Sequence, residues 1–101
     1  MTLEYLKCKI CDEIADAKDY ATEAIEIKPM APSWSKVLID MANMELIHAT
    51  NLHKMFSEYY QKISESYKEV PDYIEEMKDQ VMHCCTSDMA QAKYIIEMYS
   101  K

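Results

Sequence analysis

The sequence contains no glycine and only three prolines in 101 residues. Tight turns and short strands depend on these residues, so their scarcity excludes most β architectures and predicts an all-α fold. No apolar run reaches the length of a membrane-spanning segment. Basic residues are too few and too scattered to attract nucleic acid or an anionic membrane surface, and a formal net charge of -7 opposes both.

A chain of this length is expected to form one small domain, residues 1–101. Such a domain buries only about 60 to 70% of the surface that its unfolded chain exposes. Contact with a second copy would therefore add much to its stability. The length predicts a homodimer or a higher homo-oligomer.

Two features predict a cytoplasmic location. The first eight residues mix charged and apolar side chains, whereas a secretory signal requires an unbroken apolar core. The four cysteines occur without the turn-rich composition of a disulfide framework, so we expect reduced thiols that pack as small hydrophobes. Cys8 and Cys11, together with Cys84 and Cys85, could also form a four-thiolate zinc site or a redox pair, but both pairs fall inside predicted helices.

Capping and breaking residues predict three long helices. Thr2 is a good N-cap, and Pro29 ends the first helix. Ser33 caps a second helix that no residue interrupts, and Pro71 takes the first position of a third. The predicted helices span residues 2–28, 33–69 and 71–100. Short connections between them predict three antiparallel helices in an up-down-up bundle.

The third helix offers two alternative apolar stripes. One stripe contains Ile74, Met77, Val81, Cys84, Asp88 and Ile95, and the other contains Tyr73, Met77, Cys85, Met89, Ala92, Ile96 and Tyr99. An apolar face this broad predicts two neighbours, which are the first two helices of the same chain and a second subunit.

Three polar residues interrupt the apolar stripes of the first two helices. Alternating steps of three and four place Glu13 in the seam of the first helix, between Ile10 and Ala17. The same walk places Glu45 and His48 at successive seam positions of the second helix. Burying such groups costs several kcal/mol unless a partner compensates them.

Counting residues from the turn places Glu13 and His48 at one height. Glu13 lies sixteen residues before Pro29, and His48 lies sixteen residues after Pro32. Equal rise per residue therefore places them side by side in an antiparallel hairpin, with Glu45 one turn nearer the loop. Neighbouring helices pack about 8 to 10 Å apart, so the three side chains should converge.

Two carboxylates and one imidazole are ligands that suit iron or manganese. A buried hydrogen-bonded cluster is the plainer interpretation, but like charges would repel there, whereas a cation neutralises both carboxylates. Asp16, one turn beyond Glu13, could hydrogen-bond to a ligand. Two copies of the hairpin would supply four Glu and two His, the inventory of a dinuclear site in a four-helix bundle.

The residues around these positions also carry a family pattern. Glu13 is followed by an aromatic residue, Tyr20, seven positions on and by alanine eleven positions on, and Glu45-Leu-Ile-His48 is followed directly by alanine. Residues 10–56 resemble the ligand helices of the ferritin-like superfamily, and most closely its rubrerythrin branch. The resemblance implies that Glu13 is a terminal carboxylate, Glu45 a bridging carboxylate and His48 the nitrogen ligand, with Tyr20 beside them.

The third helix lacks the second Glu and the second Glu-x-x-His of full-length family members. A complete site would then come from two protomers, as in the half-length, dimer-built ferritin-like proteins of encapsulin shells. The resemblance implies oxidation of ferrous iron, or reduction of peroxide, by a di-iron or di-manganese centre. The competing hypothesis is a non-enzymatic helical interaction protein, such as a viral or mobile-element accessory factor, with a vestigial site. His53 and His83 have no matched carboxylate and are left out of the site.

Overall fold

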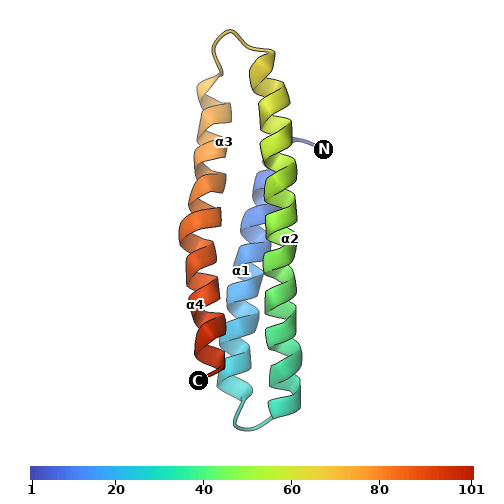
Figure 1. Cartoon of the computed structure of the whole chain (residues 1–101), viewed down its shortest axis with the longest axis vertical. Coiled ribbons are helices and arrows are strands. Elements are labelled where there is room, and N and C mark those ends of the chain that lie inside the picture. Colours follow the sequence, from blue (N-terminus) through green and yellow to red (C-terminus); the bar gives the residue numbers. More distant parts are fainter.

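The computed structural model describes residues 1–101 as a rod of 58 × 21 × 15 Å built only from helices (Figure 1). The helices are α1 (Leu3–Ile27), α2 (Pro32–Glu65), α3 (Asp72–His83) and α4 (Met89–Tyr99), with a π-helical turn, η1 (Cys84–Asp88), between the last two. The predicted all-α class is confirmed. None of the helices combines the length and the apolar character needed to cross a bilayer.

The helix ends follow local capping chemistry. The Thr2 hydroxyl accepts a hydrogen bond from the Tyr5 backbone N–H at 3.0 Å, as expected of an N-cap. The second helix begins at Pro32, one residue earlier than predicted, and its N-cap residue makes no side-chain hydrogen bond. It also ends at Glu65, four residues early. The Ser66 hydroxyl donates to the Ile63 carbonyl at 2.7 Å, a local bond that competes with continuing the helix.

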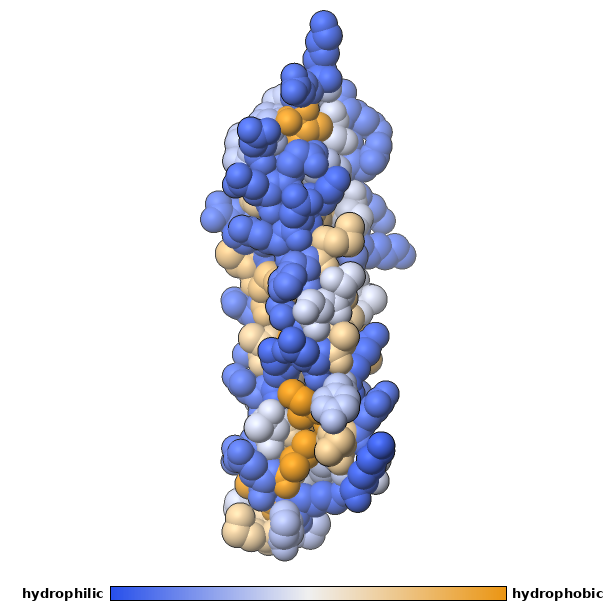
Figure 2. All heavy atoms as spheres, turned by 90° about the vertical axis from the view of Figure 1, so that its left-hand side faces the viewer, coloured by the Kyte–Doolittle hydropathy of each residue, from blue (hydrophilic) through white to orange (hydrophobic).

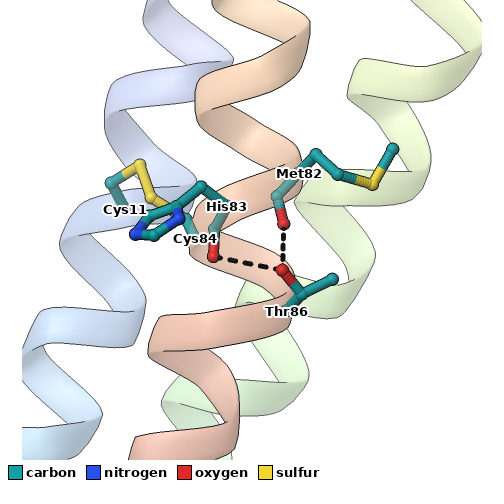
Figure 3. The surroundings of a disulfide bond; sticks show 5 residues. All are labelled: Cys11, Met82, His83, Cys84 and Thr86. Atoms are coloured by element: carbon teal, nitrogen blue, oxygen red, sulfur yellow. Dashed lines mark hydrogen bonds between the residues drawn. A yellow bond between two sulfur atoms is a disulfide. The ribbon is translucent and has the colours of Figure 1, made fainter.

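The predicted third helix is interrupted by η1, and this turn resolves the ambiguity of its apolar face. Ile74 and Val81 are buried before the turn, Cys84 is buried at its first residue, and Met89 and Ala92 are buried after it. The step from Cys84 to Met89 is five residues, which a π turn accommodates by widening the helix. Each of the two predicted stripes therefore describes one half of this segment. In Figure 3 the Thr86 hydroxyl donates to the Met82 carbonyl at 2.8 Å.

Small residues form much of the contact between α1 and α2. Ala17, Ala21 and Ala24 are fully buried on α1, and Ala42 and Ala49 are fully buried on α2. The largest buried side chain is Phe56, which joins a cluster with Leu6, Ile10 and Ile14. Ser35 is also fully buried, and its hydroxyl donates to the Ala24 carbonyl at 2.6 Å.

The predicted seam is wrong by one residue on α2 and at Glu13 of α1, whereas Ile10 and Ala17 of α1 are buried as predicted. Ile14 and Leu46 are buried where Glu13 and Glu45 were expected, and His48 is exposed. One residue is a rotation of about 100° around a helix axis. The polar groups therefore lie at the edge of the seam and not inside it, so the premise that they occupy a water-excluded core is corrected.

A polar cluster joins the upper part of α2 to α3. The Tyr60 hydroxyl donates to the Glu75 carboxylate, and the Lys78 ammonium lies 3.3 Å from the same carboxylate and 5.1 Å from the Tyr60 ring centre. The hydrogen bond from Tyr60 lowers the pKa of Glu75 below its ordinary value, and the same bond raises the pKa of Tyr60.

The outer side of α3 and α4 changes character along the rod. Figure 2 shows hydrophilic residues over most of its upper half and a short row of hydrophobic residues in its lower half. The large hydrophobic side chains that α4 exposes are Tyr94 and Met98.

Candidate metal centre

The structure brings Glu13, Glu45 and His48 together across the α1–α2 pair, as counting from the turn predicts. One donor atom from each residue lies within 4.8 Å of the other two. The His48 Nδ1 atom is 3.7 Å from Glu13 Oε2 and 3.6 Å from Glu45 Oε1. Glu45 and His48 share a helix face because they are three residues apart, and Glu13 faces them from the neighbouring helix.

The three side chains differ in their access to solvent. The Glu13 and Glu45 side chains are 15% and 19% exposed, and the His48 side chain is 50% exposed. The carboxylates are thus largely covered by the helix pair, while the imidazole faces outward. Because the carboxylates keep some contact with water, the metal-free fold does not require a cation to compensate them.

Lys9 lies beside the three donor groups. The Lys9 Nζ atom lies 3.8 Å from Glu13 Oε1, one helical turn away on α1. The sequence analysis missed this residue, although its i,i+4 spacing from Glu13 is the usual signal for such a pair. Lys9 supplies a positive charge that a bound cation would replace.

The other two residues proposed around the site are not joined to it. Asp16 is exposed and makes no hydrogen bond or ion pair with the three ligands. Tyr20 is partly buried and packs against the small-residue cluster that contains Ala21 and Ala42. Its ring lies two turns from Glu13 along the helix.

The two distances from His48 suit coordination of a single ion by one chain. Metal–ligand bonds of about 2.0 to 2.2 Å allow two donor atoms on one ion to lie up to roughly 4.2 Å apart. Both distances from His48 Nδ1 to a carboxylate oxygen fall below this limit. Oxygen and imidazole donors together suit iron and manganese. The residues present therefore fit such an ion, and three donors leave coordination positions free.

The cluster lies on the side of α1–α2 that the C-terminal helices leave uncovered. Two side chains connect α1 to η1 and α4: Cys11, which bonds Cys84, and Lys18, which donates to Gln91. At 100° per residue, Cys11 and Lys18 lie about 140° to 160° around α1 from Glu13. Glu13 therefore faces away from η1 and α4, and of the three donor groups the His48 imidazole is the most exposed.

Exposed apolar side chains surround the cluster on α2. Trp34, Met41 and Met55 are exposed, and their spacing of seven and fourteen residues includes His48 in the same series. Residues seven apart lie on one face of a helix, which is the periodicity of helix–helix contacts. We call these three residues, with Glu45 and His48, the open face.

The cysteines do not all behave as predicted. Cys11 and Cys84, which are 73 positions apart in the sequence, form a disulfide with Cα atoms 5.8 Å apart, so their interpretation as reduced thiols is corrected. Cys8 and Cys85 are free. The sequence analysis grouped these four cysteines but did not indicate this pairing, which depends on how the third helix packs against the first.

No protein-family model matches this chain, and no curated protein or solved structure matches it either.

Proposed function

We propose that this protein is a ferritin-like di-metal-carboxylate protein that binds iron or manganese at the interface of a homodimer. Each protomer would contribute Glu13, Glu45 and His48, so that two copies hold two ions. The observation that carries the proposal is the convergence of two carboxylates and an imidazole, within 4.8 Å of one another, across the α1–α2 pair.

The open face supports pairing with a second copy. It combines exposed apolar side chains with a half-exposed imidazole, and burial of both would be favourable once the imidazole has a metal partner. The α1–α2 pair, roughly 37 Å long and 20 Å wide, offers on the order of 700 Å². A stable interface needs about 800 Å² from each partner, so this face is of the right size.

Charge links metal binding to pairing. A twofold arrangement would bring four carboxylates from Glu13 and Glu45 into one interface, where they repel one another unless cations lie between them. Lys9 neutralises only one carboxylate per chain at 3.8 Å. Metal should therefore favour the dimer, and its removal should favour the monomer.

The residues of the site have separate tasks. Glu13 and Glu45 would hold the ions from opposite helices, and His48 would provide the nitrogen donor that faces the partner. Bound iron or manganese would supply the redox chemistry, which by the family resemblance is oxidation of ferrous iron or reduction of peroxide. The apolar residues of the open face would exclude water from the interface.

Metal content and solution mass, measured on the same preparation, test the proposal. Elemental analysis and light scattering should give about one iron or manganese per chain in a dimer. The variant Glu45→Gln should lose the metal and shift toward the monomer. Glu58→Gln makes the same charge change at an exposed position of α2 and should retain both properties.

A non-enzymatic interaction protein is the alternative, and the exposure of His48 favours it, because a helical partner could cover this face without any metal. Thermal unfolding separates the two functions. A ligand at one hundred times its Kd stabilises the native state by about 2.7 kcal/mol, so added ferrous iron should raise the melting temperature. A folded monomer that neither binds nor responds to ferrous iron would refute the metal proposal and favour the alternative.

A further inference from the structure

The disulfide lines a cleft at the edge of α1 that is opposite to the candidate metal centre. The cleft has a volume of about 560 Å³ and is lined by Cys8 and Cys11 of α1 and by His83 and Cys84 of the C-terminal segment, among others. Figure 3 shows the His83 imidazole next to the Cys11–Cys84 bond. Three of the four cysteines therefore line one solvent-accessible cleft.

Cys11 has two potential partners nearby. Its Cα atom is 5.8 Å from that of Cys84. Residues three apart in a helix have Cα atoms about 5 Å apart, so Cys8 is equally close along α1. Both separations fall within the range of about 4.4 to 6.8 Å that disulfides span. The Cβ atoms of residues three apart in a helix lie about 5 to 6 Å apart, beyond the roughly 3.5 to 4.5 Å of a disulfide, so Cys11 bonds to Cys8 when the N-terminal turns of α1 open locally.

The three sulfurs differ in their access to solvent. Cys8 is exposed, Cys11 is partly buried and Cys84 is buried. A thiol in solution therefore reaches Cys8 more easily than it reaches either atom of the existing bond. The fourth cysteine, Cys85, does not line the cleft, and burial raises the pKa of its thiol, which makes it a poor nucleophile at neutral pH.

We propose that Cys8 is the exchange thiol of this disulfide and makes the cleft a site for thiol–disulfide exchange with low-molecular-weight thiols. The Cys8 thiolate attacks the Cys11 sulfur, the Cys11–Cys84 bond breaks, and Cys84 leaves as a thiolate that takes up a proton. The product is a Cys8–Cys11 disulfide within α1, and this step involves no net oxidation or reduction.

An external thiol then completes the exchange reaction. Its thiolate attacks the exposed Cys8 sulfur, which forms a mixed disulfide and releases the Cys11 thiolate. Cys8 is thereby the modified residue. The C-terminal helices are released from α1 at η1, where the regular helical hydrogen bonds are already interrupted.

Tryptic digestion distinguishes the Cys11–Cys84 disulfide from the Cys8–Cys11 disulfide. Trypsin cuts after Lys7 and Lys9, so Cys8 and Cys11 fall in different peptides, and Cys84 lies with the free Cys85 in a third peptide that ends at Lys93, where opening of the bond adds a second alkyl group. After free thiols are alkylated in acid, the two disulfides give linked peptides of different mass. The oxidised protein is incubated with reduced glutathione, and samples are taken over time.

The wild type should accumulate the Cys8–Cys11 peptides before Cys84 becomes fully alkylated. In Cys8→Ser, opening of the Cys11–Cys84 bond should slow by about tenfold or more. Cys85→Ser is the matched control and should open at the wild-type rate. Because Cys8 is exposed, the variant should keep its helical circular dichroism, and Cys8→Ala should reproduce its rate.

Two results would overturn the proposal. Opening of the bond at the wild-type rate in both Cys8 variants would show that the external thiol attacks the disulfide directly. Tight binding of one zinc ion by the reduced wild type, lost in Cys8→Ser, would show that the cysteines form a metal site instead of an exchange site.

Discussion

Loss of the Cys11–Cys84 bond should remove a large part of the stability of this protein. The bond joins residues 73 positions apart and so closes most of the chain into one loop. In the chain-entropy model, a loop of this size restricts the unfolded chain enough to stabilise the native state by about 4.5 kcal/mol. Domains of this size have only about 5 to 15 kcal/mol in total. The corresponding fall in melting temperature is about 20 °C.

Urea unfolding, followed by circular dichroism, measures this difference. The samples are the oxidised wild type, the wild type reduced with a dithiol, and the double variant Cys11→Ala/Cys84→Ala. The two samples without the bond should each lose about 4.5 kcal/mol. The urea dependence of their unfolding free energy should steepen because the unfolded chain exposes more surface once the loop is open.

A matched substitution controls for the loss of a thiol. Cys85→Ser replaces a neighbouring cysteine outside the bond and should leave the difference between oxidised and reduced protein unchanged. If the oxidised and reduced wild type unfold within about 1 kcal/mol of each other, the bond does not restrain the unfolded chain, and the loop argument is refuted.

Three further predictions concern packing and pH. Phe56→Ala should lower the unfolding free energy in urea by about 3 to 5 kcal/mol, because it empties the largest buried position, and a loss below 1 kcal/mol would contradict this placement. Ser35→Ala should cost about 1 kcal/mol by the same assay, because it removes the buried hydrogen bond to Ala24, and an unchanged midpoint would argue against that bond. Because Tyr60 lowers the pKa of Glu75, this pair stabilises the fold above the ordinary carboxyl pKa of 4.5, and the contribution is lost as the pH falls through the lowered value. Stability measured against pH should therefore fall less on acidification in Tyr60→Phe than in the wild type.

The helical class could be predicted because it depends on local chemistry. The absence of glycine, the Thr2 cap and the three prolines act within a few residues of their own positions, and the structure follows them closely. The early end of α2 depends on a competing hydrogen bond from Ser66, which composition does not reveal. The π turn was not predicted either. Its effect on the sequence is that each of the two alternative stripes of the third helix describes only one half of the segment.

The core seam was predicted less well because α2 carries apolar side chains on two faces. The alternating steps that place Glu45 and His48 in the seam also place Met41 and Met55 there, but both methionines are exposed, and Ala42 and Ala49 are buried instead. Alanine contributes little to a hydrophobic pattern, yet its small size lets two helices approach closely. A pattern identifies apolar faces but does not say which neighbour covers each one.

The convergence of the three donor groups could be predicted because it requires only equal rise along two antiparallel helices. Their burial could not be predicted in the same way, because burial depends on rotation about the helix axis. A shift of one residue turns a core position into an edge position. Glu13 illustrates the difference: its height along the rod was correct, while its expected place in the core belongs to Ile14.

The position of α1 explains how one helix can contribute to two chemically different sites. Cys11 and Glu13 are two residues apart and therefore about 160° apart around the helix, so the disulfide holds one edge while the carboxylate faces the other. Between these edges, Ile14 and Ala17 pack into the same buried cluster as Leu46 of α2. That contact fixes Glu13 beside Glu45 whether or not the disulfide is present. Opening the bond should therefore loosen the C-terminal helices and leave the donor groups in place.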